Sequence, residues 1–449
     1  MNRQLFGTDG IRGKVNKYPM TAQTVLTLGQ SVAKYFNKEG KRIKAVIGKD
    51  TRLSGYLFEN ALTAGLCSFG VDVFLIGTMP TPAIAHITKS FAADLGIVIS
   101  ASHNSSDDNG IKIFDGNGYK LPDEVELEIE KILFKGVSSE GFNSKCLGKV
   151  FRVEDARGRY IEFVKNSIRN NRLTGTKVVL DCAHGAAYKV APLILRELGA
   201  DVVVCNNSPD GLNINSECGS QYPYVIAEAV VRENADLGIA LDGDADRVIL
   251  VDETGASVDG DHIMAIAAIF LKDTGLLSND TVVATIMSNL GFEKSLKEKN
   301  INVVRTDVGD RYVIEVMKKN GHKLGGEQSG HIVFSEFSTT GDGTLTALQV
   351  MNIMKHTGKK LSKLKECMRT YPQVLKNVKV KEKRPIDDLK NVLETIKRVE
   401  EELGDDGRTL VRYSGTEQKC RVMIEGIDEI QIKKYADMIC DAIEKEIGT

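Results

Sequence analysis

Short apolar, β-branched runs alternate along the chain with longer stretches of helical character. The first part of the chain has three such runs, at residues 44–50, 71–77 and 94–100, and the last is apolar almost throughout. Runs of this kind predict strands buried on both faces, and strands that alternate with helices are typical of βαβ units. The first part is therefore expected to be an α/β unit whose parallel or mixed sheet is covered by helices.

The same rhythm then returns twice. A second round of strand-like runs covers residues 176–252, and a third covers residues 281–334. Three rounds of one pattern predict three related α/β units. Between the first strands and the second round, residues 110–121 have the alternation of a β-hairpin, with Gly116 and Gly118 at its turn.

The end of the chain differs in character from the three repeats. Charged helical stretches flank residues 408–426, which are predicted to form two strands around a polar loop. This pattern indicates a smaller α+β domain. The fold class predicted is thus α/β, with three related α/β domains with mixed sheets and a smaller C-terminal α+β domain. The expected boundaries are 1–150, 151–254, 255–365 and 366–449.

Composition and charge exclude several classes of protein. Apolar residues make up 42% and charged residues 27% of the 449 positions, which is an ordinary globular balance. A formal net charge of −2 offers no electrostatic footprint for nucleic acid or an anionic membrane. We therefore expect no nucleic-acid or membrane partner, and an anionic ligand would need a local cluster of cations.

Location is indicated by the apolar stretches and the cysteines. The first residues contain no apolar core of a signal peptide, and the longest apolar stretch, 263–271, is far shorter than the roughly 20 residues of a membrane span. The eight cysteines are scattered, with no CxxC pair. This distribution fits reduced thiols and predicts a cytoplasmic protein.

The sharpest chemical signal is the string Asp242-Gly-Asp244-Ala-Asp246-Arg247. Three alternating carboxylates repel one another unless a cation neutralises them, and their hard oxygens suit Mg²⁺ or Ca²⁺. A calcium EF-hand competes, because Glu253 stands at the twelfth position, but Arg247 occupies the sixth position where that loop needs glycine. An aspartyl phosphatase with Asp242 as nucleophile competes as well, and so does a plain acidic turn.

Three further polar strings are weaker when taken alone. Ser102 lies in SASHN at the end of a buried strand, where open α/β sheets place their ligands, but the string also suits a simple capping turn. The loop of residues 412–421 offers two arginines and two hydroxyls, enough for a phosphate cradle, although Ser-Gly-Thr is a common hairpin turn. Residues 325–331, GGEQSGH, offer hydrogen-bonding groups suited to sugar hydroxyls beside paired glycines.

All four strings, in this order, resemble the α-D-phosphohexomutase superfamily over essentially the whole chain. The opening FGTDGIRG, the stretch GLNIN from Gly211, VGDRYV from Val308 and GGEQSGH resemble the branch that acts on glucosamine phosphates. The resemblance implies an isomerase that interconverts glucosamine 6-phosphate and glucosamine 1-phosphate through a phosphoserine and a bisphosphate sugar. A mutase acting on glucose or mannose phosphates, an aspartyl phosphatase and a non-catalytic sugar-phosphate-binding relative compete with this assignment.

The resemblance also implies roles for individual residues. Ser102 would carry the phosphate, which would hold Mg²⁺ together with Asp242, Asp244 and Asp246. The catalytic groups would be Arg12, Lys112, Arg247 and His331. The sugar would be bound by Glu327, Ser329 and Asp310. The phosphate that is not transferred would be held by Arg412, Ser414, Gly415, Thr416 and Arg421. Lys112 and His331 are the candidates for proton transfer, Asp310 is the candidate partner of the amino group unless it only caps a helix, and a monomer or homodimer is expected.

Two positions depart from the family pattern. Ser105 follows Ser102-His-Asn where the family usually has proline, and Gln418 stands in the phosphate loop where proline is common. Neither position supplies a catalytic group. Both departures predict loops that are less rigid than those of the family.

Overall fold

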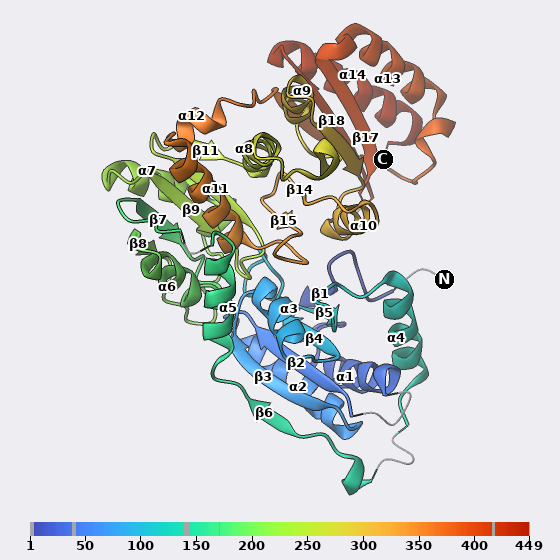
Figure 1. Ribbon diagram of the computed structural model, residues 1–449. Helices are drawn as coiled ribbons and strands as arrows, with labels where there is room; N and C mark the ends of the chain where they lie inside the picture. Colours follow the sequence, from blue (N-terminus) through green and yellow to red (C-terminus); the bar gives the residue numbers. More distant parts are fainter. Residues whose placement is uncertain (1–3, 38–41, 139–142, 170, 415–417, 449) are drawn as a thin grey trace. The chain divides into compact units, whose positions relative to one another are not determined.

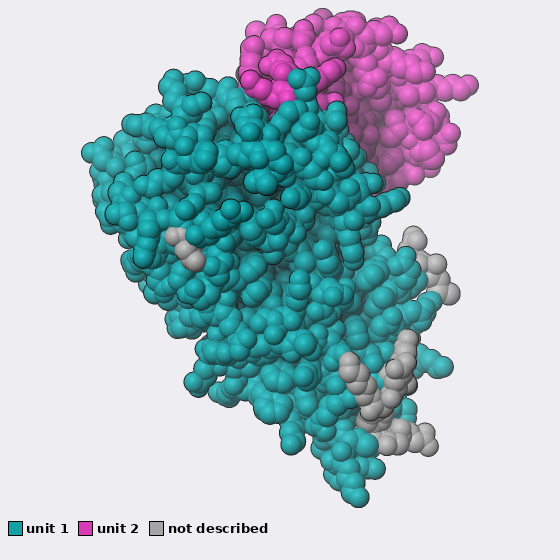
Figure 2. Space-filling view, viewed as in Figure 1, with its two compact units in different colours: residues 1–287, 300–367 teal, residues 288–299, 368–449 magenta. Residues whose placement is uncertain are grey.

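A computed structural model describes residues 4–37, 42–138, 143–169, 171–414 and 418–448 (Figure 1). The chain forms two compact units, drawn in teal and magenta in Figure 2. The larger unit contains residues 1–287 and 300–367, and the smaller unit contains residues 288–299 and 368–449. The smaller unit therefore takes a short segment from the middle of the chain as well as the chain's end.

The first α/β part of the larger unit is built on a six-stranded sheet with the order β1-β5-β4-β2-β3-β6. Strands β2, β3, β4 and β6 run parallel, whereas β5 is antiparallel to both β4 and β1. Helix α1 packs on α2 and α4, while α3 contacts β2 and β4. The elements are β1 Ile11–Lys14, α1 Ala22–Phe36, β2 Lys44–Lys49, α2 Ser54–Ser68, β3 Asp72–Thr78, α3 Thr81–Ser90, β4 Leu95–Ile99, β5 Asp108–Asp115, α4 Asp123–Lys135 and β6 Val150–Arg152.

The second α/β part has a five-stranded sheet with the order β11-β10-β9-β7-β8. Its elements are α5 Ala156–Asn166, β7 Lys177–Asp181, α6 Val190–Glu197, β8 Asp201–Cys205, α7 Pro223–Arg232, β9 Leu237–Leu241, β10 Val248–Asp252 and β11 Ser257–Val258. The third part has the order β13-β12-β14-β15. Its elements are α8 Gly260–Asp273, β12 Thr281–Thr285, β13 Asn302–Thr306, α10 Asp310–Asn320, β14 Leu324–Gly326, β15 Ile332–Phe334, α11 Gly343–Thr357 and α12 Leu361–Lys365.

One strand order is repeated in all three sheets. Each sheet contains a set of three parallel strands with one antiparallel strand at the edge of the set. The three sets are β5-β4-β2-β3, β10-β9-β7-β8 and β15-β14-β12-β13. The prediction of three related α/β units with mixed sheets is confirmed. The loop before the antiparallel strand covers residues 100–107 in the first set, 242–247 in the second and 327–331 in the third. Three of the four polar strings thus occupy the same topological position.

The smaller unit has a three-stranded antiparallel sheet with the order β16-β18-β17. Helix α9 belongs to this unit: Leu290 N–H donates to Glu425 Oε2 at 3.0 Å, and Lys294 pairs with Asp406 at 2.7 Å. The elements are α9 Leu290–Glu298, β16 Gln373–Lys379, α13 Lys390–Leu403, β17 Gly407–Tyr413, β18 Lys419–Gly426 and α14 Glu429–Ile447. The predicted small α+β domain is confirmed, whereas the four exact boundaries stay a prediction.

The predicted hairpin at residues 110–121 differs from the observed structure. Residues 108–115 form β5, but the second arm is reduced to one isolated bridge between Phe114 and Lys120. Strand β1 pairs only with residues 108–111 of β5, and beyond it the chain turns back beside β5. Two backbone hydrogen bonds hold this short return, from Asp115 N–H to Tyr119 O at 2.7 Å and from Leu121 N–H to Ile113 O at 3.1 Å, so the second arm is too short to form a strand.

Candidate active site

Ser102 lies at the meeting point of two of the repeated loops. Its backbone is in the left-handed region, with φ of 52°, and its side chain is buried. The hydroxyl donates a hydrogen bond of 2.6 Å to Oδ2 of Asp242, and the N–H of Ser102 donates to Ser100 Oγ at 2.9 Å. The first two α/β parts therefore bring a hydroxyl and a carboxylate from distant segments into direct contact.

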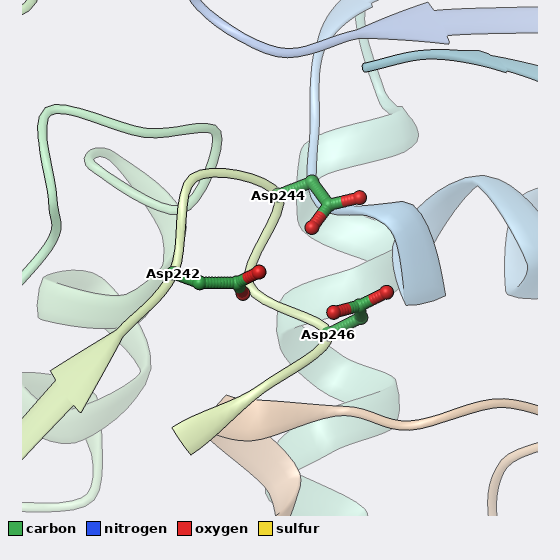
Figure 3. Close-up of side chains that lie close together, drawn as sticks. All are labelled: Asp242, Asp244 and Asp246. Carbon is green, nitrogen blue, oxygen red and sulfur yellow. The ribbon is translucent and has the colours of Figure 1, made fainter. Parts of the chain in front are cut away.

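The three carboxylates of the β9–β10 loop face one another, as Figure 3 shows. One oxygen each from Asp242, Asp244 and Asp246 lies within 4.8 Å of the others, and all three residues are buried. Asp244 Oδ1 and Asp246 Oδ1 are buried without a hydrogen-bond partner among the described residues. Buried carboxylate oxygens are normally paired or bound to a metal, so this set fits a hard divalent cation held by oxygen ligands.

The elements that flank this loop exclude an EF-hand. Strands β9 and β10 precede and follow the loop, where an EF-hand requires helices. Glu253, the twelfth residue of such a motif, accepts hydrogen bonds from Ser362 Oγ at 2.5 Å and from Ser362 N–H at 3.3 Å. The carboxylate of Glu253 is thus used outside the loop.

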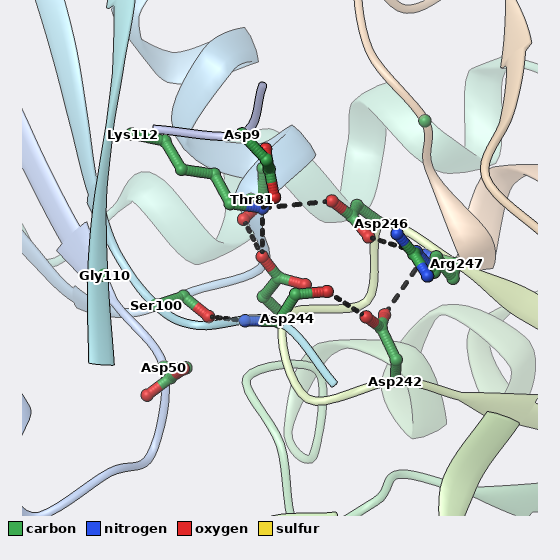
Figure 4. A network of polar contacts seen from close by, with 12 residues as sticks. Asp9, Asp50, Thr81, Ser100, Gly110, Lys112, Asp242, Asp244, Asp246 and Arg247 are labelled. Carbon is green, nitrogen blue, oxygen red and sulfur yellow. Dashed lines mark hydrogen bonds and ion pairs between the residues drawn. The ribbon is translucent and has the colours of Figure 1, made fainter. Parts of the chain in front are cut away.

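Lys112 of β5 is the principal cation beside the carboxylates (Figure 4). Its Nζ lies 2.9 Å from Asp244 Oδ2, 3.2 Å from Asp246 Oδ2 and 3.1 Å from Asp9 Oδ2. Burial lowers the pKa of Lys112, but these three carboxylates outweigh burial and hold the pKa well above its usual value. In this geometry Lys112 is a fixed positive charge that partly neutralises the acidic loop.

The carboxylates respond differently to their surroundings. Burial raises the pKa of Asp242, and the neighbouring charges of Asp246 and Asp244 raise it further, so that it stands well above the ordinary value. Burial also acts to raise the pKa of Asp246, but Lys112 and His331 lower it well below that value. The negative charge of the loop is therefore concentrated on the side that faces Lys112 and His331.

Five of the remaining predicted groups line one cavity of about 280 Å³. They come from all three α/β parts, and the lining includes Arg12, Arg247, Asp310, Glu327 and His331. Ser329 donates to Glu327 Oε2 at 3.1 Å, and the other oxygen of Glu327 accepts the N–H of Gly309 at 3.1 Å. The cavity combines guanidinium groups with carboxylates, which suits a ligand that carries both phosphate and hydroxyl groups.

His331 lies between two carboxylates. Its Nδ1 is 3.6 Å from Asp246 Oδ2 and its Nε2 is 3.4 Å from Asp310 Oδ2. Burial lowers the pKa of His331, but Asp246 and then Asp310 outweigh it and raise the pKa above the ordinary value. Gly341 N–H also points to Nε2 at 3.0 Å, so the neutral ring carries its proton on Nδ1, toward Asp246.

Asp310 begins helix α10, and its side chain has a partner outside that helix. Its Oδ2 accepts a hydrogen bond of 2.5 Å from Lys120 Nζ, and Lys120 also pairs with Asp9. The N-cap residue of α10 is the preceding Gly309, which supplies no side-chain cap. The carboxylate of Asp310 lines the cavity and lies beside the ring of His331.

Sequence reasoning did not single out Asp9, Lys120 and His103 as functional residues. Asp9 pairs with Arg12, Lys112 and Lys120, and these cations overcome burial to hold its pKa well below the ordinary value. Burial, with help from the charges of Arg247 and Arg12, lowers the pKa of His103 to about 4. Only the string FGTDGIRG pointed to Asp9, because a single aspartate in a turn has no pattern of its own.

The predicted phosphate-binding residues lie in the smaller unit. Arg412 of β17 and Arg421 of β18 are direct partners in the antiparallel register. Burial lowers the pKa of Arg412, and the charge of Arg421 lowers it further. Ser414 is buried next to these strands, whereas Gly415 and Thr416 lie outside the described residues. Two adjacent guanidinium groups at the start and end of one loop favour an anionic ligand.

Four family models match the chain in order. The phosphoglucomutase/phosphomannomutase α/β/α domains I, II and III match residues 3–140, 158–255 and 259–371, and the C-terminal domain matches residues 375–442. The chain is a phosphohexomutase. It belongs to the phosphoglucomutase/phosphomannomutase family within the α-D-phosphohexomutase superfamily, as the four strings indicated.

Curated relatives of this phosphohexomutase cover its full length. A protein named phosphoglucosamine mutase from Geobacter metallireducens is 54% identical over 448 residues, with 99% of each chain covered. Another of the same name from Nitratidesulfovibrio vulgaris is 51% identical over 449 residues, with 100% of each chain covered.

Solved structures show the same fold at low sequence identity. A phosphoglucomutase/phosphomannomutase family protein from Burkholderia thailandensis has a TM-score of 0.80 at 20% identity, covering 100% of both chains. N-acetylphosphoglucosamine mutase from Aspergillus fumigatus, solved with GlcNAc-6P and magnesium, has a TM-score of 0.68 at 18% identity, covering 99% of this chain and 96% of that one. Within the described residues, no helix has the length and apolarity that crossing a membrane requires.

Proposed function

We propose that this phosphohexomutase interconverts glucosamine 6-phosphate and glucosamine 1-phosphate through a phosphorylated Ser102. The observation that carries the proposal is the hydrogen bond from Ser102 Oγ to Asp242, which joins a hydroxyl to a buried set of three carboxylates. The names of the full-length relatives support the choice of sugar. A sugar phosphate is the substrate class that the family implies.

The proposed reaction has two balanced half-steps. In the first, the bond between phosphorus and Ser102 Oγ breaks while a bond forms between phosphorus and the free hydroxyl oxygen of the sugar. The proton that this hydroxyl loses is balanced by the one that Ser102 Oγ takes up. The resulting bisphosphate turns end over end, and its other phosphate returns to Ser102 by the reverse step.

The residues of this chain have distinct roles in the proposal. Lys112, Arg12 and Arg247 stabilise charge on the transferring phosphate, and Lys112 suits this role because three carboxylates hold it as a fixed cation. His331, with one ring nitrogen toward each of two carboxylates, is the better-placed proton carrier. A proton-transfer role for Lys112 stays a prediction.

The proposed cofactor is Mg²⁺, which Asp242, Asp244 and Asp246 would hold together with the phosphate of Ser102. The donor set fits, since all three ligands are oxygens and two of the carboxylate oxygens have no hydrogen-bond partner among the described residues. When bound, the ion supplies charge neutralisation for phosphoryl transfer. Arg412, Ser414, Gly415, Thr416 and Arg421 are proposed to hold the phosphate that is not transferred, and Glu327 and Ser329 to bind sugar hydroxyls.

Asp310 is the proposed determinant of the amino sugar. An amino group that is protonated near neutral pH donates to a carboxylate, whereas a hydroxyl at the same carbon gains less from that charge. The side chain of Asp310 lines the cavity and is already oriented by Lys120. The stronger interaction of Asp310 with an amino group than with a hydroxyl corresponds to a preference for glucosamine phosphate over glucose phosphate of roughly ten- to a thousand-fold in kcat/KM.

The proposal is tested by measuring kcat/KM for glucosamine, glucose and mannose phosphates on one preparation. Glucosamine phosphate is expected to be preferred, and Asp310→Asn should narrow the preference. Asp307→Asn, an exposed change three residues earlier, is the matched control and should leave it unchanged. Equal or higher efficiency on glucose or mannose phosphate would overturn the amino-sugar assignment and leave the mutase chemistry standing.

A cytoplasmic location is also proposed. None of the eight cysteines forms a disulfide bond, which is the expected state of thiols in a reducing compartment. A monomer or homodimer stays a prediction, which the mass of the protein in solution would decide.

A further inference from the structure

The loop that carries Ser102 is held by two buried side chains from other segments. Arg52 stands between β2 and α2, and Asn215 lies between β8 and α7 in the second α/β part. Both side chains direct their donors at backbone carbonyls of residues 102–105. Their contacts are therefore with the backbone of the loop, whichever side chains the loop carries.

Arg52 makes contact with three of these carbonyls. Its Nη2 donates to Ser102 O at 3.2 Å and to Asn104 O at 2.5 Å, and its Nε points to Ser105 O at 3.4 Å. Its Nη1 pairs with Asp50, and both side chains of this ion pair are completely buried. The ion pair therefore fixes the guanidinium plane, and the plane in turn fixes the loop.

Asn215 completes the arrangement from the second α/β part. Its Nδ2 donates to Ser102 O at 2.9 Å and to Asn104 O at 2.9 Å, the same two oxygens that Arg52 contacts. The backbone N–H of Asn215 donates to Ala183 O at 2.9 Å, which anchors the residue in its own part of the chain. Its φ is 59°, a conformation that asparagine tolerates better than most residues.

The loop needs such support for two physical reasons. Ser102 has φ of 52°, a strained conformation that persists only when the surroundings impose it. Buried carbonyl oxygens must also find donors, and here side chains supply them in place of a sheet ladder.

We infer that Arg52 and Asn215 are positioning residues that set the direction of Ser102 Oγ toward Asp242 and so toward the reacting phosphate. The inference rests on the proposed function, in which Ser102 carries the phosphate. Because the contacts reach the backbone of Ser102 and of the residues that follow it, loosening them changes the geometry of transfer more than the binding of the sugar.

The first test replaces Asn215 by glycine, which accepts the positive φ and removes both donors. We expect kcat to fall about 10- to 100-fold with KM changed less than about threefold. In the phosphorylated protein, the ³¹P resonance of the phosphoserine should broaden or shift. Asn213→Gly is the matched control, since Asn213 lies two residues earlier and its side chain donates to Ser208 O instead of the Ser102 loop.

The second test replaces Arg52 by lysine, which keeps a charge for Asp50 but cannot reach three carbonyls at once. We expect kcat to fall at least about tenfold. Arg42→Lys is the control, because Arg42 makes a two-point ion pair with Asp72 at 2.8 and 2.9 Å, away from the Ser102 loop. If Asn215→Gly does not fold, Arg52→Lys alone decides the question.

The outcomes for this inference differ from those for the proposed function. A folded Asn215→Gly or Arg52→Lys variant with wild-type kcat and an unchanged ³¹P resonance would overturn the positioning role. An equal loss of kcat in the matched control variant would overturn it as well. The proposed function has a separate test, in which the wild-type protein is incubated with a bisphosphate sugar and its intact mass is measured. If the mass shows no phosphate on Ser102, the proposed function is overturned.

Discussion

The hydroxyl of Ser102 lies 2.6 Å from Oδ2 of Asp242 and donates a hydrogen bond to it. The two residues come from equivalent loops of two repeated sheets, 140 positions apart. The repeat of strand order thus brings equivalent turns together, and each turn contributes a different chemical group. A hydroxyl comes from one turn and the carboxylates come from the other.

Ser102→Ala is expected to abolish isomerisation, by at least about 10⁴-fold, because the covalent step has no other acceptor. The fold should persist, since the change removes one hydroxyl and keeps the backbone contacts of the loop. Activity is measured on the purified variant, and circular dichroism reports the fold. Near-normal turnover would exclude the phosphoserine mechanism.

Removal of divalent cations by a chelator is expected to abolish the mutase activity, and added Mg²⁺ is expected to restore that activity. Asp244→Asn should lower the rate roughly 10²-fold or more, because an amide does not replace a carboxylate in a metal site. Calorimetry should show weaker Mg²⁺ binding by this variant, whereas Asp273→Asn, an exposed change in α8, should bind Mg²⁺ normally. Full activity in excess chelator would mean that the carboxylates are only an acidic turn.

Arg421→Ala is expected to raise KM about 10-fold or more, because it removes one of two guanidinium groups that are partners across β17 and β18. The value of kcat should fall as well if this phosphate contact is stronger in the transition state than in the ground state. Arg421→Lys should recover only part of the loss, since an ammonium group has no planar fork. Steady-state kinetics on all three proteins checks this, and wild-type values for Arg421→Ala would exclude the loop as the phosphate site.

Acid should destabilise the protein partly through His86 of α3. The ring stacks on Phe163 with centroids 3.9 Å apart, and burial, with Lys89 and Arg159, lowers the pKa of His86 from 6.5 to about 4. Between these two values the unfolded chain binds more protons, so the contribution of His86 to stability is complete above pH 6.5 and is lost as the pH falls toward 4.

Replacing His86 by glutamine should therefore flatten the dependence of stability on pH. After allowance for partial exposure, we expect a difference of about 1–2 kcal/mol between pH 7 and pH 4.5. Thermal melting over this range is the measurement, with His356→Gln, an exposed change in α11, as control. An unchanged pH slope for His86→Gln would contradict the assignment.

Much of the fold was readable from the sequence because buried strands of parallel sheets are apolar throughout. The run at residues 94–100 predicted β4, and the acidic string directly after another apolar run predicted the carboxylate loop between β9 and β10. The repeat was visible because each unit has the same alternation of strand and helix. That Ser102 would share a site with these carboxylates followed only from the family resemblance, because the two strings lie in different repeats.

Other features had no sequence signal. Arg52 and Asn215 act on backbone carbonyls, and hydrogen bonds of this kind leave no periodic pattern. The hairpin at residues 110–121 was predicted from local alternation, but β1 takes the edge of β5 at residues 108–111 and only a short second arm returns beside residues 113–115. Local patterns predict elements, whereas the partners of an element depend on which edges and donors remain free.

The route of the chain between the two units has a consequence for cutting the protein. The chain passes from one unit to the other three times, at residues 287–288, 299–300 and 367–368. A protease cut after residue 367 would leave residues 368–449 without the α9 segment on the same fragment, but still bound to it through contacts such as Leu290 to Glu425. The two fragments should then co-purify without a covalent link, and residues 368–449 made alone should expose the surface that α9 covers.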